Sequence, residues 1–137
     1  MAENETDYVE WLKEKSQEEP VASFLNMELT ELKPGFARVK MKVMPQFTNF
    51  HGLTFGGIIM ALSDQAFGYA SNSLAYPSVA SQFSTCFISA AREGDELTAE
   101  CRVIKSGKRA GFSEITITNQ DGRLVAKSTG VTILVSR

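Results

Sequence analysis

One carboxylate stands out because it lies in an otherwise apolar segment rich in small residues. Asp64 follows the run IIMALS and precedes QAFGYAS, and Gly56 and Gly57 come about two helical turns before it. An ionised carboxylate in an apolar setting is unfavourable unless it is paired or hydrogen-bonded. Since a carboxylate in such a place can act as a general base or as a nucleophile, Asp64 is the first candidate for a catalytic group.

The segment that carries Asp64 is predicted to be a helix. Residues 57–72 contain no proline, and apolar residues occur almost all round, which indicates a buried helix. At helical spacing one stripe of this helix contains Ala61, Asp64, Gly68 and Ser71. Asp64 is therefore expected to face a groove of small residues, which admits a neighbouring backbone or a ligand. The spacing is equally compatible with a polar face that contacts water or a structural partner.

The glycine pair before the helix is suited to oxyanion binding. Gly56 and Gly57 allow the backbone to approach a ligand closely, and a helix N-terminus offers unpaired N–H groups. A tight loop leading into a buried helix would need the same residues. Gly56 and Asp64 are about 12 Å apart along a helix, so one small reacting group cannot touch both. If both are catalytic, each site takes the glycine N–H from one subunit and the carboxylate from another, which predicts an obligate homodimer.

The remaining segments predict one α+β domain over residues 1–137. Residues 1–20 form a helical extension, with a short helix over 5–18 that ends at Pro20. Residues 24–43 are typical of two strands around the Pro34–Gly35 turn. Four more strands are predicted at about 79–89, 96–106, 110–119 and 123–135, the last two joined by a hairpin at Asp121–Gly122. This order fits an antiparallel sheet curved over one central helix.

Composition excludes several classes of partner. Fourteen Lys and Arg against sixteen Asp and Glu give a net charge of −2, so we expect no nucleic-acid or membrane partner. The acidic start and the absence of an apolar run of about 18 residues argue against a signal peptide and a membrane span, and we expect a cytoplasmic protein. Cys86 and Cys101 are expected to be buried free thiols, and no Cys/His pattern indicates a metal or a cofactor.

Asn49, the run Phe55-Gly56-Gly57 and Asp64 together resemble the motif of the hotdog-fold acyl-CoA thioesterases, specifically of their phenylacetate-pathway, PaaI-like branch. The resemblance continues through AFGYASNS and VASQFSTCFISAAREGD to the turn at Gly107 and covers about residues 21–135. It implies the hotdog fold, in which a curved antiparallel sheet wraps around one long central helix. It also implies hydrolysis of an acyl-CoA thioester in a site built by a homodimer, usually within a homotetramer.

The resemblance also assigns roles to single residues. Asp64 would be the general base or the nucleophile, and the Gly56 N–H would polarise the thioester carbonyl. Asn49 would hold the water or the carbonyl from the glycine side of the site, and Ser81 would orient the water beside Asp64. An aryl or medium-chain acyl group would fit beside Phe55 if its ring lines the acyl pocket.

This chain departs from the family motif at Phe55, where the family has histidine. The glycine N–H survives that change, but any hydrogen bond from an imidazole is lost. Phe55 then either lines the acyl pocket or marks reduced activity. His51 is the single histidine, and it either substitutes in space or is an ordinary surface residue.

The phosphates of CoA need cations near a surface groove, and the segment KSGKR supplies Lys105, Lys108 and Arg109. Arg92 is a further candidate, although charged turn residues are often merely solvated.

Three other functions are compatible with parts of the sequence. A non-catalytic acyl-CoA or lipid-binding protein fits the broken motif at Phe55, but a groove that only binds an apolar chain gains nothing from Asp64. A hydratase would pair the carboxylate with a catalytic histidine, for which His51 is a poor fit. A nucleophilic Cys86 activated by His51 has no local support in the sequence.

Overall fold

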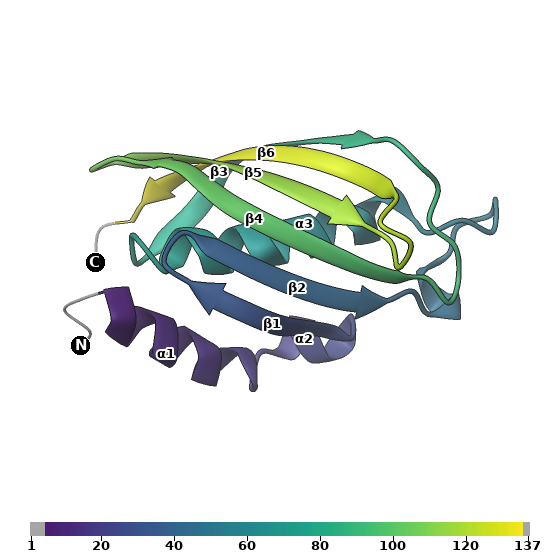
Figure 1. The fold of residues 1–137 in the computed structure, drawn as a ribbon, viewed down its shortest axis with the longest axis horizontal. Coiled ribbons are helices and arrows are strands. Elements are labelled where there is room, and N and C mark those ends of the chain that lie inside the picture. Colours follow the sequence, from purple (N-terminus) through teal and green to yellow (C-terminus); the bar gives the residue numbers. More distant parts are fainter. Residues whose placement is uncertain (1–4, 136–137) are drawn as a thin grey trace.

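The chain folds as a six-stranded antiparallel sheet curled around one long helix (Figure 1). The computed structural model describes residues 5–135, with side chains from Tyr8 onward. The helices are α1 (Glu5–Ser16), α2 (Pro20–Phe24) and the central α3 (Gly56–Asn72), with a short 3-10 turn at Pro45–Phe47. The strands are β1 (Met27–Lys33), β2 (Phe36–Lys42), β3 (Ser78–Phe87), β4 (Glu96–Ser106), β5 (Ala110–Thr118) and β6 (Leu124–Leu134). This is the predicted hotdog fold.

The sheet forms because its strands alternate between apolar and polar residues. In β2, Val39 and Met41 are buried against α3, while Lys40 and Lys42 point to solvent. The apolar face of α3 packs against these residues, and on it Leu62 and Phe67 are almost completely buried. The core therefore lies between the concave face of the sheet and one face of α3.

The strand order β1-β2-β4-β5-β6-β3 leaves two edges. α1 packs against β1, so the N-terminal segment lies beside that edge (Figure 1). β3 pairs with β6 on one side, and no strand of residues 5–135 pairs with its other side. Several side chains of β3 and of the residue after it are exposed and apolar, among them Val79, Phe87 and Ile88. An apolar edge strand of this kind is a site for pairing with another chain.

Two predictions about single elements were wrong. Phe24 does not begin a strand, because residues 20–24 form the short helix α2, whose first position suits Pro20. Cys86 is exposed because it lies on the edge strand β3, whereas Cys101 is buried as predicted; both thiols are free. Within the described residues, no helix is long and apolar enough to cross a membrane.

Candidate active site

Asp64 lies on the open face of α3. The prediction of a helix buried all round was wrong, because the sheet covers only one side of α3 and leaves the Asp64 side chain exposed in the single chain. Ser71 does not share the face of Asp64, since its side chain is turned into the core. Asn72 takes that place instead, and the open face contains Asp64, Gly68 and Asn72 at successive turns.

A groove of about 710 Å³ runs along this face. Its floor extends from Asp64 past Gly68 to Asn72, and its other wall is formed by Trp11 of α1 and by Tyr76, just before β3. The volume lies within the range of about 300–1,000 Å³ that is usual for small-molecule sites. Asp64 is thus placed at a cavity large enough for an organic substrate.

The groove changes the acidity of Asp64. Although the side chain is exposed on one side, the protein around it displaces part of the water near the carboxylate, and this desolvation raises the pKa of Asp64 above its ordinary value. None of the ion pairs among the described residues includes Asp64, so no cation opposes this effect. A carboxylate with a raised pKa and no partner is a better proton acceptor than an ordinary surface aspartate.

The glycine pair forms the first turn of α3, as predicted. The Phe55 N–H donates to the carbonyl of Phe47 (2.8 Å), and the Phe55 carbonyl accepts from the Ile58 N–H (2.9 Å), which starts the helix. Within the described residues the N–H groups of Gly56 and Gly57 have no acceptor, and no side chain caps this end. Two unpaired N–H groups at a helix N-terminus are suited to an oxyanion.

Two aromatic rings surround these N–H groups. A Cβ at Gly57 would lie 2.7 Å from Cε2 of Phe55, and a Cβ at Gly56 would lie 3.2 Å from Cζ of Phe87. A side chain at position 57 would therefore displace the Phe55 ring, and one at position 56 would crowd the Phe87 ring. Both rings remain more than half exposed, so they present an apolar surface beside the N–H groups. Phe87 was not predicted, because it lies far along the chain from the motif.

Asn49 organises the loop that leads to Gly56. Its Oδ1 accepts from the N–H groups of His51 (2.9 Å) and Leu53 (3.2 Å). Its Nδ2 donates to none of the described residues and is available to a ligand. His51 is exposed, and its ring lies against Phe50 with 4.1 Å between the ring centroids.

Ser81 lies in a β-bulge of β3, where the pairing with β6 shifts between Ala80 and Gln82. Its Oγ donates to the carbonyl of Val131 (3.2 Å). Bulges often redirect a side chain next to an active site. In the single chain neither Ser81 nor Asn49 is hydrogen-bonded to Asp64, so the structure does not bring the predicted catalytic side chains together within one subunit.

The predicted phosphate-binding residues are also separated from the glycine pair. Lys105, Lys108 and Arg109 are exposed around the β4–β5 hairpin, which lies at the C-terminal end of α3 (Figure 1). Since α3 has 17 residues, Gly56 is roughly 25 Å of helix away. Arg92 precedes β4 and lies at the other end of that strand.

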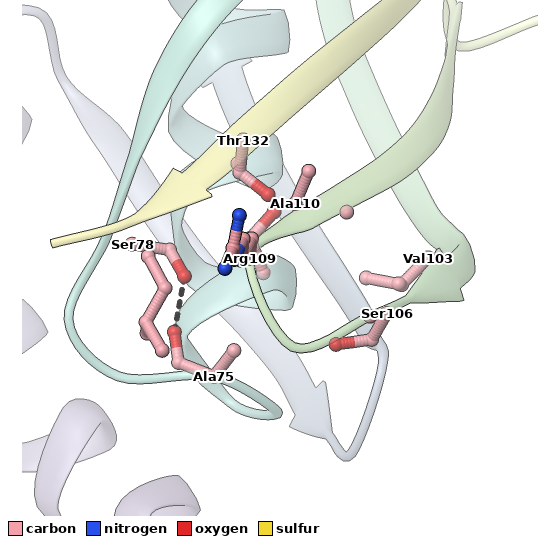
Figure 2. A pocket seen from close by; sticks show the side chains of 11 residues that line it. Ala75, Ser78, Val103, Ser106, Arg109, Ala110 and Thr132 are labelled. Atoms are coloured by element: carbon pink, nitrogen blue, oxygen red, sulfur yellow. Dashed lines mark hydrogen bonds between the residues drawn. The ribbon is translucent and has the colours of Figure 1, made fainter.

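A second cavity lies beside this hairpin. Figure 2 shows Arg109, Ser106 and Thr132 around it, with the hydrogen bond from Ser78 to the carbonyl of Ala75 on its other side. Its volume is about 10 Å³, which is space for one water molecule. The buried Ser71 Oγ lines it and has no partner among the described residues. This cavity is too small for an acyl group, so the larger groove remains the substrate site candidate.

The groove brings together residues that the sequence did not single out. Trp11, Glu19 and Tyr76 face Asp64 from outside the motif. Glu19 accepts hydrogen bonds from Gln65 and Tyr69 of α3, and Trp11 packs against Tyr76. These contacts join residues that are remote in sequence, so no local pattern could have indicated them. Among the described side chains, no three of His, Cys, Asp and Glu group as they would around a metal ion.

Comparison with known proteins agrees with this geometry. Residues 51–126 match the thioesterase superfamily. The chain is 38% identical over 105 residues to the acyl-coenzyme A thioesterase PaaI of Escherichia coli, an alignment that covers 77% of this chain and 75% of that protein. The structure of the Escherichia coli PaaI protein superimposes with a TM-score of 0.87 at 33% identity, covering 92% of this chain and 93% of that one.

Two streptococcal structures with bound ligands are also similar. A Streptococcus mutans protein bound to acetyl CoA has a TM-score of 0.80 at 28% identity and covers 83% of this chain and 92% of its own. A hypothetical thioesterase protein of Streptococcus pneumoniae with coenzyme A has a TM-score of 0.83 at 27% identity, and the match covers 90% of this chain and 97% of that one. With a hotdog fold, the Gly-Gly helix start and the carboxylate on the open face of α3, the chain belongs to the thioesterase superfamily, among the PaaI-like acyl-CoA thioesterases.

Proposed function

We propose that this protein hydrolyses acyl-CoA thioesters to a free acid and CoA, with Asp64 as the catalytic carboxylate. The observation that carries the proposal is the position of Asp64, unpaired and with a raised pKa, at a groove of about 710 Å³. The PaaI relative and the two streptococcal structures with acetyl CoA and coenzyme A support an acyl-CoA substrate.

Two routes for the reaction are open to this carboxylate. As a general base, Asp64 takes a proton from water while the water oxygen bonds to the thioester carbon, and the C–S bond then breaks. As a nucleophile, an Asp64 oxygen bonds to that carbon and displaces the CoA thiolate, and water then hydrolyses the mixed anhydride. In both routes the carbonyl oxygen becomes negative, and the Gly56 N–H stabilises it. The thiolate finally takes up a proton.

We further propose that the active site is built by two subunits. Gly56 and Asp64 are about 12 Å apart along α3, too far for both to act on one carbonyl of the same site. The open edge of β3, with the exposed apolar side chains of Val79 and Phe87 and of Ile88 just after the strand, offers a surface for a second copy, whose sheet would continue this one. Each site then combines Asp64 of one subunit with Gly56 of the other. Association of two such dimers into a homotetramer is a further expectation.

Mixing two inactive variants tests the shared site. Asp64→Asn and Gly56→Pro should each lose most CoA release, because one removes the carboxylate and the other the N–H. In a heterodimer of the two, one site has both groups intact and the other has neither. After random mixing of subunits, half of the dimers carry one good site, so about a quarter of wild-type activity should return. Activity no greater than the sum of the two variants would exclude a site shared between subunits.

A non-catalytic acyl-CoA-binding protein remains the second candidate, and the exposed Phe55 ring in place of the family histidine favours it. That candidate requires wild type and Asp64→Asn to bind an acyl-CoA equally and to release no CoA. Turnover by wild type that is lost in Asp64→Asn would exclude it.

A further inference from the structure

Glu19 links the segment that carries α1 and α2 to α3 by hydrogen bonds. Glu19, just before α2, is half-buried, and its Oε1 accepts hydrogen bonds from Nε2 of Gln65 and from Oη of Tyr69 (2.8 Å). Burial, together with Glu19, raises the pKa of Tyr69, so the phenol keeps its proton and remains a donor. Gln65 is the neighbour of Asp64 in the chain. These hydrogen bonds therefore lie next to the turn of α3 that contains Asp64.

Apart from Asp64, the polar side chains on the floor of the groove are hydrogen-bonded within the protein. Asn72 donates from Nδ2 to the carbonyls of Gly68 (2.8 Å) and Ser78 (3.1 Å), and its Oδ1 accepts from the Ser78 N–H (2.8 Å). Gln65 and Tyr69 are occupied by Glu19. Polar groups that are satisfied within the protein offer little to a polar ligand, so the floor is suited to an apolar one.

Aromatic rings form the opposite wall. Trp11 packs edge-on against Tyr76, with 5.0 Å between the ring centroids, and Tyr8 stacks on the same ring at 5.4 Å. Trp11 comes from α1 and Tyr76 from the segment between α3 and β3. These contacts fix the position of α1 relative to the far end of the groove.

Gly68 has no side chain and so leaves free space in the middle of the groove. It lies one turn beyond Asp64, about 6 Å along the helix. A Cβ added at Gly68 would meet no atom within 4 Å, in contrast to Gly130, where it would lie 2.6 Å from Phe67. A side chain at position 68 would therefore enter the groove without displacing the core.

We infer that α1 and α2 form the outer wall of the acyl pocket, and that Gly68 and Trp11 set the size of the apolar acyl group that the enzyme accepts. Glu19 is a positioning residue that holds this wall on α3. The inference rests on the proposed hydrolysis at Asp64: with the carbonyl at Asp64, the acyl group extends along the groove past Gly68 towards Asn72.

The test is the dependence of kcat/KM on acyl length, measured with acetyl-, hexanoyl- and decanoyl-CoA. Gly68→Leu fills the groove one turn beyond the carbonyl, so kcat/KM for the two longer esters should fall at least about tenfold more than for acetyl-CoA. Trp11→Ala widens the groove and should move the preference from hexanoyl- towards decanoyl-CoA. Equal effects on all three esters in both variants would overturn the inference.

Glu19 has a matched control on the same segment. Glu19→Leu removes the acceptor and should broaden the length profile, whereas Glu19→Gln keeps an acceptor oxygen and should restore it. Glu14→Leu makes the same change on α1 at an exposed position outside the groove and should keep the wild-type profile. A Glu19→Leu variant with lower stability and an unchanged length profile would show a merely structural role.

If no ester is hydrolysed, binding measurements test the acyl pocket instead. In the Asp64→Asn background, calorimetry should show decanoyl-CoA binding more tightly than CoA alone, and Gly68→Leu should remove at least about tenfold of that advantage. An unchanged advantage in Gly68→Leu overturns the acyl pocket. Absence of CoA release from wild type, with the advantage intact and sensitive to Gly68→Leu, instead overturns only the hydrolysis.

Discussion

Replacing Gly56 by proline should remove the oxyanion N–H while leaving the helix intact. Gly56 is the first residue of α3, where proline is the favoured residue and its fixed φ suits the helix. Phe55 has φ −59° and ψ 131°, the extended conformation that a following proline requires. The Gly56 N–H has no acceptor within the described chain, so proline breaks no hydrogen bond of the fold.

Gly56→Ala is the matched control. Alanine also places a Cβ 3.2 Å from the Phe87 ring, which is half exposed and can move aside, but alanine keeps the N–H. Any loss common to both variants reports the crowding at Phe87. The additional loss in Gly56→Pro reports the N–H alone.

The expected size of that additional loss follows from other oxyanion sites. Removal of one donor lowers kcat about 10²- to 10³-fold, which corresponds to about 2.7–4 kcal/mol of transition-state stabilisation. The assay is steady-state CoA release, with thermal unfolding of both variants as the check on folding. If Gly56→Pro and Gly56→Ala have the same kcat, or differ only in KM, the Gly56 N–H does not stabilise the developing oxyanion.

Three other predictions concern binding and stability. Charge removal at Lys108 and Arg109 should raise KM for an acyl-CoA more than for a truncated thioester without the nucleotide, because only the former carries the phosphates; equal effects would exclude phosphate binding. Gly130→Ala should lower the free energy of unfolding by about 1–3 kcal/mol in denaturant titrations, since its Cβ would collide with the buried Phe67 ring, and an unchanged value would contradict the packing. Because the pKa of Asp64 is raised in the folded state, its protonated form stabilises folding below the unfolded pKa of about 3.9, and this contribution is lost as pH rises. The Tm of Asp64→Asn should therefore increase relative to the wild-type Tm from about pH 4 upward. A Tm difference that does not change with pH would contradict the raised pKa.

The positions of strands such as β2 and β4 were predictable because buried and more exposed residues alternate along much of their length. The segment 96–106 was predicted as a strand and β4 spans Glu96–Ser106, with Leu97, Ala99 and Cys101 buried on one face. Turn residues fixed the ends, as at Gly122, whose positive φ of 78° closes the last hairpin. α2 was missed because Pro20 ends one helix and also begins the next.

The exposure of Asp64 was not predictable from the helix pattern. An apolar helix face looks the same in sequence whether its own sheet covers it or a second copy of the chain does. The stripe through Asp64 was therefore predicted to end at Ser71, although the fold turns Ser71 into the core and places Asn72 in the groove. The separation of Gly56 from Asp64 along α3 was predictable, because it depends only on helix geometry.

The groove itself has no local sequence signal. Glu19 and Tyr69 are 50 residues apart, and their hydrogen bond depends on the fold that places the residue before α2 beside α3. Residues such as Trp11 and Tyr76 are ordinary aromatic residues in their own segments. They become candidate specificity residues only when the fold places them opposite Gly68.

The most direct test of the account is the pH dependence of CoA release by wild type and Asp64→Asn across aryl and straight-chain acyl-CoA esters. Wild-type kcat should rise with pH through a pKa above the ordinary value near 4, because Asp64 must lose its proton. Asp64→Asn, folded and able to bind the ester, should lose at least about two orders of magnitude in kcat. Wild-type turnover that survives in Asp64→Asn would contradict the assignment of Asp64 as the catalytic carboxylate.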